Sequence, residues 1–449
     1  MTPVNVDEWR ARVMDVLNEP EKLRFVGRVT RVVGLSIEAI LPACTVGASC
    51  SIQLNGGGRL VAEIVGFRGS TALLMPIGEV AGVRDGAVVE LLGADPVIPV
   101  GDAMLGRVLG PMLEPMDGGP ALLLPHRTLL WATPPVAMLR RRIYRPMTTG
   151  VRSLDTFTTF GEGQRVGIFA GAGVGKSTLL GMLARQADAD VVVVGLIGER
   201  GREVREFIER DLGPAGLARS VIVVATGDAP PVARVRAAAA ATAIAEYFRR
   251  RDKRVLLMMD SLTRVSMAQR EIGLAAGEPP TSKGYPPSVF TLMPRLLERA
   301  GNDEGKGSIT GLYTVLVEGD DLSDPIADSA RSILDGHVVL SRALANAGHF
   351  PAVDVLGSVS RVMNDVTTED HRAVASAVRE LMAIHKEAAD MIDIGAYQKG
   401  SNPKIDRAVQ AVDPIRVFLR QRTDERTPLS EALVRASQVL QQKNTEVHA

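Results

Sequence analysis

The chain has few aromatic residues and almost no cysteine. Aromatic residues make up only 4% of the 449 positions, and Cys44 and Cys50 are the only cysteines. Two cysteines are too few for a disulfide framework, so we expect both to be buried free thiols. The six histidines show no spacing that is typical of metal ligands. These shortages argue against a small disulfide-stabilised protein and against a histidine-based metal site.

A strong charge of one sign and a long hydrophobic run are also missing. The 52 basic residues balance 52 acidic ones and the pI is near 7.0, which argues against a dedicated nucleic-acid-binding protein but leaves a local basic channel open. The unbroken aliphatic stretches are far shorter than the ~20 residues of a membrane helix. The start, MTPVNVDEWRARVMDVLNEPEK, lacks the basic and then apolar order of a signal peptide. We expect a cytoplasmic protein that is peripheral to a larger assembly.

The N-terminal third of the chain divides into three segments. Residues 1–20 contain a short amphipathic helix that would dock either on a partner or on the domain behind it, with an apolar face formed by Val6, Trp9, Val13 and Leu17. Residues 21–95 alternate short β-rich runs with glycine turns, which predicts a small β-barrel. Residues 96–150 are rich in proline and glycine, and we interpret them as a linker into the next domain.

The remaining two thirds change from one pattern to another. In residues 151–365, apolar strands alternate with helices such as the alanine-rich run 232–250, which predicts an α/β domain with a parallel sheet and helices on its faces. Helical patterns dominate residues 366–449, so we expect a C-terminal helical domain. The predicted fold is therefore an α/β core between an N-terminal β-barrel and a helical C-terminal domain.

The most informative motif is RVGIFAGAGVGKS at residues 165–177, a glycine-rich loop between an apolar strand and a helix. Glycines let the backbone wrap around a phosphate chain, so that successive N–H groups and the helix N-terminus face the anion. We interpret it as the P-loop of a RecA-like core, although Ala170 replaces the usual first glycine. Lys176 would contact the β- and γ-phosphates, and the Ser177 hydroxyl would bind Mg²⁺. The predicted nucleotide-binding residues are Gly171, Ala172, Gly173, Val174, Gly175, Lys176, Ser177 and Thr178.

Two carboxylates that follow other apolar strands are candidates for chemistry on the phosphate. Glu199 follows VVVVGLIG, and Asp260 follows VLLMM. Because the carboxyl ends of buried parallel strands face the ligand crevice, we expect both side chains near the P-loop. Asp260, of the Walker B type, would complete the Mg²⁺ site with Ser177. The alternatives are structural: Glu199 could simply pair with Arg200 or Arg202, and apolar runs that end in aspartate are common.

The order of barrel, nucleotide-binding core and helical tail resembles the catalytic subunit of the rotary ATP synthases. PAVDVLGSVSR at residues 351–361 matches that superfamily's signature around an active-site arginine. Within the superfamily, residues 270–301, 313–342 and 393–406 resemble the flagellum-specific protein-export ATPase. The match covers about residues 22–440, and the injectisome ATPase of virulence systems is the neighbouring branch.

The resemblance implies a role for each matching residue. Glu199 would orient and polarise the attacking water, at a position where non-catalytic subunits of the superfamily carry glutamine. Arg200 would belong to the network around the γ-phosphate or to the subunit interface. Arg361 would be an arginine finger that reaches the active site of the adjacent subunit, its alternative being a structural salt bridge. One polypeptide would then supply both faces of each site, which implies a ring, most simply a homohexamer.

Phe350 lies where the family places a tyrosine stacked on adenine. Phenylalanine keeps the aromatic face and loses only the hydroxyl, and a plain core role before proline is the alternative. Because any purine can stack on this ring, the preference for ATP comes from the family resemblance. The implied cofactors are ATP and Mg²⁺.

The function implied by the resemblance is a hexameric ATPase of the flagellar type III protein-export apparatus. It would couple ATP hydrolysis to chaperone release and to the delivery of flagellar subunits to the export gate at the cytoplasmic membrane. The implied partners are further copies of the chain, the regulator and stalk proteins of the apparatus, and export chaperones with their flagellar substrates, but no nucleic acid.

Four other functions fit a ring of P-loop domains. The injectisome ATPase is the main alternative. A rotary synthase subunit is disfavoured because residues 384–410 carry no dense acidic run for rotor contact. An RNA translocase is disfavoured because residues 22–95 contain only two phenylalanines, Phe25 and Phe67, for stacking on bases. Glu199 argues against a non-catalytic structural subunit.

Overall fold

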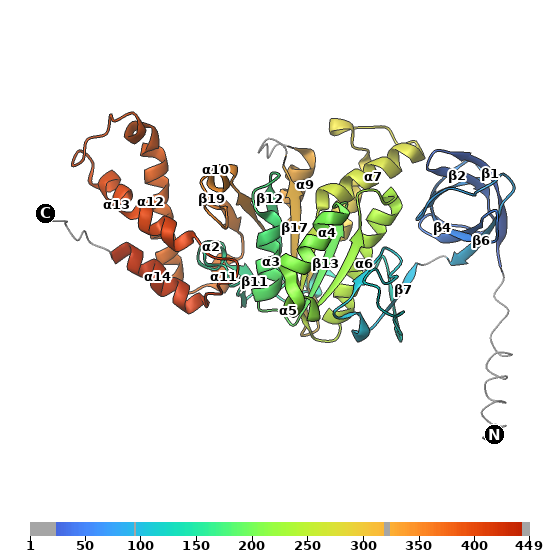
Figure 1. The fold of residues 1–449 in the computed structure, drawn as a ribbon, viewed down its shortest axis with the longest axis horizontal. Coiled ribbons are helices and arrows are strands. Elements are labelled where there is room, and N and C mark those ends of the chain that lie inside the picture. The colour runs from blue at the N-terminus through green and yellow to red at the C-terminus, as the bar shows by residue number, and fades with distance from the viewer. Residues whose placement is uncertain (1–23, 94–95, 318–323, 442–449) are drawn as a thin grey trace, which may run out of the picture. The chain divides into compact units, whose positions relative to one another are not determined.

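The structure, a computed structural model, describes residues 24–93, 96–317 and 324–441. The chain divides into two compact units, Met1–Pro96 and Val97–Ala449, whose elements are labelled in Figure 1. The amphipathic helix that we expect within residues 1–20 lies outside the described residues. Within the described ranges, no helix is both long and apolar enough to cross a membrane.

The N-terminal unit is a closed barrel of six antiparallel strands in the order β1-β2-β5-β4-β3-β6. Alternate side chains point inward, so that Ile37, Ile52 and Ile64 form part of its core. Cys50 is buried in this core and Cys44 is half-buried, and both are free thiols as predicted. Burial is the main cause that raises the pKa of Cys50 to about 12, which keeps its thiol protonated and unreactive. The strands are β1 (Val26–Val33), β2 (Ser36–Ile40), β3 (Ser49–Gln53), β4 (Arg59–Arg68), β5 (Thr71–Pro76) and β6 (Val88–Gly93).

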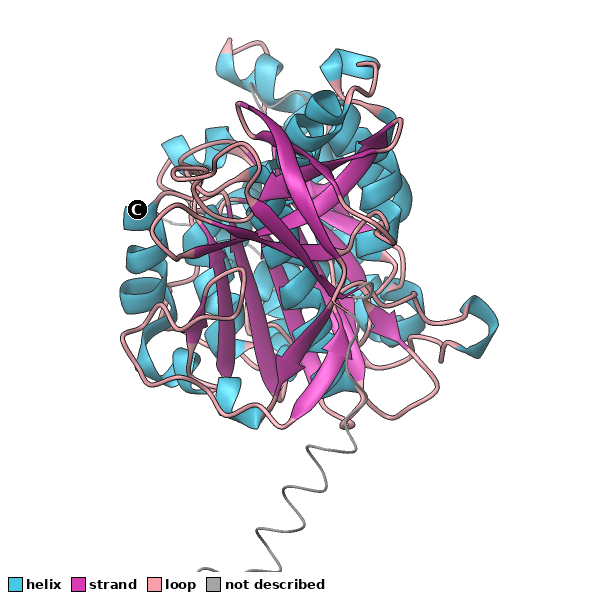
Figure 2. Cartoon of the chain, turned by 90° about the vertical axis from the view of Figure 1, so that its right-hand side faces the viewer, coloured by secondary structure: helices cyan, strands magenta, loops and turns pink. Residues whose placement is uncertain are grey.

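The second unit is built on a sheet with the strand order β19-β18-β12-β17-β15-β13-β14-β8 and with β16 beside β17. Only β16 and β19 run antiparallel to their neighbours in the described sheet, and Figure 2 shows its strands among helices. The carboxyl ends of the parallel strands share one edge, where open α/β sheets bind ligands. The strands are β8 (Val108–Leu109), β12 (Arg165–Ala170), β13 (Val191–Ile197), β14 (Ser220–Ala225), β15 (Arg254–Asp260), β16 (Gly301–Asn302), β17 (Ser308–Leu316), β18 (Gly336–Leu340) and β19 (Val353–Ser360).

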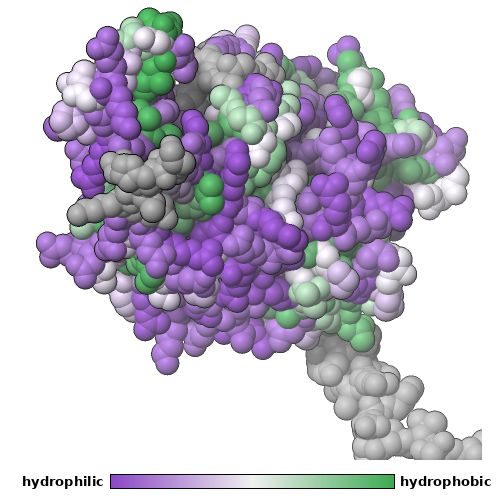
Figure 3. All heavy atoms as spheres, turned by 60° about the vertical axis from the view of Figure 1, so that its left-hand side comes forward, coloured by the Kyte–Doolittle hydropathy of each residue, from purple (hydrophilic) through white to green (hydrophobic). Residues whose placement is uncertain are grey.

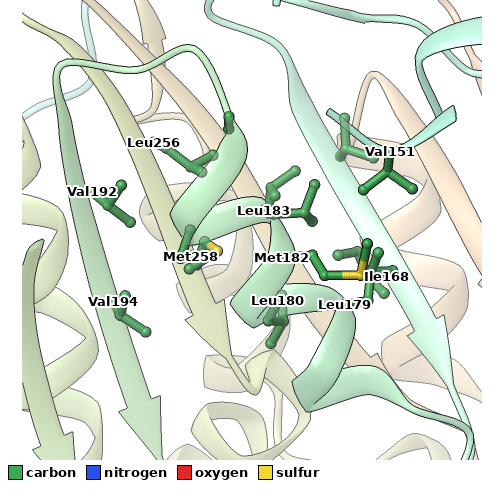
Figure 4. Packing of buried hydrophobic residues seen from close by; sticks show 14 of the residues in the cluster. Val151, Ile168, Leu179, Leu180, Met182, Leu183, Val192, Val194, Leu256 and Met258 are labelled. Carbon is green, nitrogen blue, oxygen red and sulfur yellow. The ribbon is translucent and has the colours of Figure 1, made fainter. Parts of the chain in front are cut away.

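Helices cover both faces of this sheet. On one face, α3 packs Leu180 and Leu183 against strand residues such as Ile168 and Val192, as seen in Figure 4. On the other face, α6 is buried along its whole length, which its alanine run allows because small side chains let a helix pack closely on a sheet. The helices are α2 (Arg152–Phe157), α3 (Lys176–Gln186), α4 (Gly201–Glu206), α5 (Gly213–Ala218), α6 (Pro231–Arg249), α7 (Leu262–Ala276), α8 (Pro287–Leu297), α9 (Pro325–Ile333) and α10 (Arg342–Asn346), with a π-helical turn at Phe207–Leu212.

A buried ion pair holds residues 97–150 to the core. This segment contributes β8 to the central sheet, and its strands β7 (Val97–Val100) and β9 (His126–Leu129) form an antiparallel pair. The Arg299 guanidinium donates two hydrogen bonds to the Glu246 carboxylate, at 2.9 and 2.8 Å, and a third to the Leu130 carbonyl, at 2.9 Å. The Arg299 and Glu246 side chains are 0% and 2% exposed. The pair therefore ties α6 and the end of α8 to the segment that enters the core.

The C-terminal helices pack on the α/β core through α2. Their interior contains Val378, Leu381 and Phe418, and the Phe418 ring meets Phe157 of α2 edge-on at 6.2 Å. The buried Arg152 donates a hydrogen bond to the Phe418 carbonyl at 2.8 Å. The C-terminal helices are α11 (Met363–Val366), α12 (Glu369–Asp393), α13 (Pro403–Leu419) and α14 (Leu429–Gln441). Two short strands on either side of α2, β10 (Pro146–Met147) and β11 (Phe160–Gly161), pair with each other.

The outer surface of the molecule is largely polar on the face drawn in Figure 3, where hydrophobic residues form only small groups. Exposed apolar side chains on the C-terminal helices include Met391 and Val417. The predicted fold class is confirmed: a β-barrel is followed by an α/β core with a mostly parallel sheet and by a helical C-terminal part.

We predict that Arg299→Ala destabilises the second unit by about 3–5 kcal/mol, because the Glu246 carboxylate would stay buried without its partner. The measurement is the urea unfolding midpoint followed by tryptophan fluorescence, since the Arg299 guanidinium lies over the Trp131 ring at 5.9 Å. Arg202→Ala is the control, because it removes an exposed ion pair with Glu206 and should cost less than about 0.5 kcal/mol. Equal midpoints in the two variants would contradict the prediction.

Candidate active site

The glycine-rich segment lies at the carboxyl edge of the sheet, between the end of β12 and the start of α3. Gly173 and Gly175 have φ angles of 77° and 86°, which residues with a side chain rarely adopt. Val174 turns its side chain into the core and is 1% exposed, whereas Ala172 and Gly173 are exposed. Gly171 is buried at the end of the strand. This alternation presents backbone rather than side chains to an approaching anion.

The first turn of α3 carries the polar residues of the motif. Gly175 is the N-cap of this helix and no side chain caps it, so the first N–H groups of the helix are available to phosphate oxygens. Ser177 is exposed and Thr178 is half-buried. Ala170, the departure from the usual motif, pairs within the ladder with Leu316 and Leu340. The strand therefore continues through this position, and the alanine methyl is accommodated.

Three of the predicted residues converge beside this loop. Because β13 and β15 are neighbours with Leu196 opposite Asp260, Glu199 and Asp260 emerge on the same edge. The Lys176 Nζ atom lies 2.5 Å from Asp260 Oδ1 and 3.2 Å from Glu199 Oε1. The structure thus brings together one cation from the P-loop and one carboxylate from each of two strands.

The electrostatics of this cluster follow from its burial. Burial is the main cause that raises the pKa of Glu199 to about 7, with the Lys176 charge acting against this rise and the Asp260 charge adding to it. Burial also disfavours the Lys176 ammonium, but the charges of Asp260 and Glu199 outweigh this effect and raise the pKa of Lys176. A carboxylate with a pKa near neutrality can hold or release a proton at physiological pH, as expected of a group that polarises water.

The Phe350 ring lies against the glycine-rich loop. A Cβ atom on Gly175 would lie 3.3 Å from two carbons of this ring, and the Phe350 side chain is 45% exposed. Its backbone carbonyl accepts a hydrogen bond from the Gln421 N–H at 3.0 Å. The structure therefore places an open aromatic face next to the loop, where a purine base can stack on it.

Arg361 lies at the opposite edge of the sheet from the P-loop. In the antiparallel pair, Val353 is opposite Leu340 at the carboxyl edge, whereas Ser360 is opposite Gly336 at the amino edge. Gly336 and Leu340 of β18, which pair with the two ends of β19, are about 13 Å apart at roughly 3.3 Å per residue, because β19 bulges between Asp354 and Val359. Arg361 is exposed and donates a hydrogen bond to the Arg331 carbonyl at 3.2 Å. Its guanidinium therefore lies at the amino edge of the sheet and not beside the P-loop of its own chain.

Arg200 also does not join the cluster. It is the N-cap residue of α4, and its side chain is 86% exposed and lies 3.5 Å from Glu203. In this conformation the Arg200 side chain therefore contacts neither Lys176 nor Glu199, a contact that the role expected for it in the phosphate network would require.

Three polar residues near the site were missed by the sequence analysis. The Thr314 hydroxyl donates to Asp260 Oδ1 at 2.7 Å, Arg342 donates to the Ala172 carbonyl at 3.2 Å, and a hydrogen bond from Glu199 lowers the pKa of Glu203. Each carries a weak sequence signal. Thr314 is a hydroxyl residue inside an apolar strand, Arg342 follows the end of another strand, and Glu203 stands four positions after Glu199.

The oxygen donors at this site fit Mg²⁺ that arrives with a nucleotide. Asp260 supplies a carboxylate and Ser177 a hydroxyl, and Mg²⁺ typically takes one or two protein ligands and completes its shell with phosphate oxygens and water. Among the described residues, no group of three or more histidine, cysteine, aspartate and glutamate side chains could hold a metal ion. A protein-only metal cage is therefore not formed by this part of the chain.

Family models match all three parts of the chain: the barrel, the α/β core and the C-terminal helices. The model described as the ATP synthase alpha/beta family, nucleotide-binding domain, matches residues 150–360. The beta-barrel domain model of the same family matches residues 29–93. The model described as the T3SS EscN ATPase C-terminal domain matches residues 367–436.

Individual relatives point in the same direction. A flagellum-specific ATP synthase from Bacillus subtilis is 52% identical over 94% of this chain and 96% of its own length. A type 3 secretion system ATPase from Xanthomonas euvesicatoria is 52% identical over 90% of this chain and 91% of its own length. The solved structure of the assembled ATPase EscN with its central stalk EscO, from the type III secretion system of enteropathogenic E. coli, superposes with a TM-score of 0.85. The two sequences are 43% identical, and the superposition covers 92% of this chain and 100% of the EscN chain.

We predict that Phe350→Ala weakens ATP binding about tenfold, because stacking of a base on an aromatic ring contributes about 1–3 kcal/mol. Phe350→Tyr keeps the ring and should bind as the wild type does. Titration of each full-length protein with a fluorescent ATP analogue measures the affinity. Phe67→Ala is the matched control, because Phe67 is 46% exposed but belongs to the barrel. Undiminished affinity in Phe350→Ala would exclude the stacking role.

Proposed function

The chain belongs to the ATP synthase alpha/beta family, and from this premise we propose that it hydrolyses ATP for a type III protein-export apparatus. We favour the flagellar apparatus and keep the injectisome as the alternative, since relatives named for both systems are 52% identical to this chain. The observation that carries the proposal is the meeting of Lys176, Glu199 and Asp260 beside the phosphate-binding loop.

The proposed reaction uses few groups, because phosphoryl transfer needs positioning and charge stabilisation more than covalent help. The backbone of Gly171–Gly175 and the N-terminus of α3 bind the phosphates, and Lys176 contacts the transferred group. Glu199 holds the attacking water by hydrogen bonding and accepts its proton. Asp260 and Ser177 would hold Mg²⁺, which neutralises phosphate charge when it is bound with the nucleotide.

The position of Arg361 supports a ring in which neighbouring subunits complete one another's sites. Its guanidinium is exposed at the edge opposite the P-loop, so it is available to the site of another copy. An arginine finger supplied in trans typically contributes about 10³–10⁵ to the rate of phosphoryl transfer. EscN, which superposes on this chain, is described as an assembled ATPase. We propose a homohexameric ring with Arg200 and Arg361 at the subunit boundaries.

The proposed partners follow from the same family. EscN has been solved with a central stalk, and we propose that this ring holds a stalk protein and is restrained by a regulator protein. Chaperones with flagellar substrates would be its cargo, and the ring would act at the inner face of the cytoplasmic membrane beside the export gate. No role in binding nucleic acid is proposed.

We predict that Glu199→Gln binds ATP within about threefold of the wild type but hydrolyses it at least a hundredfold more slowly. The amide keeps the shape of the side chain and cannot accept the proton of the attacking water. The measurements are ATP-analogue affinity and phosphate release by the purified protein. Glu209→Gln is the control, because Glu209 is exposed and pairs only with Arg205 among the described contacts. Vigorous hydrolysis by Glu199→Gln would mean that another group positions the water.

The same substitution tests the cellular role. We would replace the gene in its source cell by the Glu199→Gln allele and assay swimming, secreted filament protein and growth. Lost motility and missing filament protein at normal growth would support flagellar export. Intact motility would shift the proposal to the injectisome, and a general energy defect would contradict an export role.

We predict that Arg361→Ala binds ATP normally and turns over at least a hundredfold more slowly, and that activity returns when it is mixed with Glu199→Gln. In a randomly mixed ring, about a quarter of the interfaces join an intact Glu199 to an intact Arg361 of the neighbour. The readout is phosphate release after the two variants are mixed and reassembled. A mixture of Glu199→Gln with the Glu199→Gln, Arg361→Ala double variant is the control and should stay inactive. Mixed rings without recovery would refute a finger supplied in trans.

A further inference from the structure

The Asp260 carboxylate is held by two hydrogen bonds in the described part of the chain, and both reach the same oxygen. Lys176 Nζ lies 2.5 Å from Oδ1, and the Thr314 hydroxyl donates to Oδ1 at 2.7 Å. Thr314 could instead donate to the Met259 carbonyl, but that oxygen is 3.4 Å away. Because an O–H donor prefers a distance of about 2.7–2.8 Å and a charged acceptor, the carboxylate is the better partner.

The two donors differ in how firmly they are fixed. Thr314 lies on β17 between two parallel neighbours, with Ile168 of β12 opposite it and with Tyr313 opposite Met259 of β15. It is fully buried at 0% exposure, and a branched Cβ restricts its side-chain rotation. The sheet therefore holds this hydroxyl in place. Lys176, in contrast, reaches the carboxylate from the start of a helix on a flexible four-carbon stem.

We propose that Thr314 is a positioning residue that fixes the orientation of the Asp260 carboxylate for the Mg²⁺ that accompanies ATP. This inference rests on the proposed ATP hydrolysis, in which Lys176 contacts phosphate and is then shared between the nucleotide and Asp260. Thr314 is the partner whose bond to Oδ1 does not depend on the nucleotide. Without it, a buried carboxylate would be free to turn about its terminal torsion, which is broad in energy, and would offer the metal a less defined ligand.

The proposal requires the hydroxyl and not merely the volume of the side chain. Valine has nearly the shape of threonine but no donor, so Thr314→Val removes the hydrogen bond with little change in packing. Serine keeps the hydroxyl and loses a methyl group. A positioning role therefore predicts that serine rescues what valine loses, whereas a packing role predicts that valine is the milder change.

The same strand supplies a matched control. Thr310 lies four positions earlier and so on the same face of β17, and it is 2% exposed. Its hydroxyl accepts a hydrogen bond from the Gly163 N–H at 2.9 Å, toward the amino end of the sheet and away from Asp260. Thr310→Val thus removes a buried threonine hydroxyl from the same strand without touching the metal ligand.

The experiment measures how much Mg²⁺ strengthens nucleotide binding. Each full-length protein, shown by circular dichroism to be folded, is titrated with a fluorescent non-hydrolysable ATP analogue in excess Mg²⁺ and again in EDTA. We expect Thr314→Val to lose about tenfold of the gain in affinity that Mg²⁺ gives, which corresponds to one hydrogen bond to a charged group. Affinity in EDTA should be unchanged. Thr314→Ser and Thr310→Val should keep the wild-type gain within about twofold.

Several outcomes would overturn the inference. A wild-type Mg²⁺ gain in Thr314→Val would show that Asp260 needs no fixing by this hydroxyl. An equal loss of affinity with and without Mg²⁺ would place the effect on the P-loop or the fold, as would a similar loss in Thr310→Val. Failure of the wild type itself to bind the analogue is a distinct result, because it would contradict the proposed function and not the role of Thr314 alone.

Discussion

The candidate active site depends on one ammonium group between a buried carboxylate, Asp260, and a half-buried one, Glu199. Two carboxylates this near each other in a low-dielectric crevice cannot both stay ionised without a cation, and Lys176 supplies it at 2.5 and 3.2 Å from Asp260 and Glu199. The competition between burial, repulsion and the lysine charge leaves the pKa of Glu199 at about 7. If a bound phosphate draws Lys176 away, the Asp260 carboxylate loses its neighbouring positive charge, and a second cation beside it becomes favourable.

The parallel sheet explains why these groups meet. β12, β13 and β15 arise from separate stretches of sequence, but their carboxyl ends reach the same edge and deliver the P-loop, Glu199 and Asp260 there. The antiparallel course of β19 sends its last residue the other way, so that Arg361 arrives at the far edge. The same rule of strand direction therefore brings Glu199 and Asp260 beside the P-loop and places Arg361 away from them.

Local sequence patterns were sufficient to predict residues whose position follows from a simple physical requirement. A phosphate loop needs glycines at positive φ, as at Gly173 and Gly175, and a ligand at the sheet edge must follow an apolar strand, as Asp260 does. Thr314 could not be found in this way, because its partner is set by the order of β15 and β17 and not by anything adjacent in the chain. Arg299 and Glu246 are 53 positions apart, and β8 forms in a proline- and glycine-rich stretch because a sheet edge is there to pair with. Tertiary context overrides composition at such places.

The separation of Arg361 from the P-loop of its own chain has a consequence for where in the cell ATP is hydrolysed. Under the proposed function, a solitary chain carries a complete nucleotide pocket and yet lacks the charge that completes the reaction. Newly made copies would therefore remain idle, and consumption would rise more steeply than the amount of protein, since it depends on encounters between copies. Any structure that gathers the chains at one location would then also determine where in the cell ATP is hydrolysed.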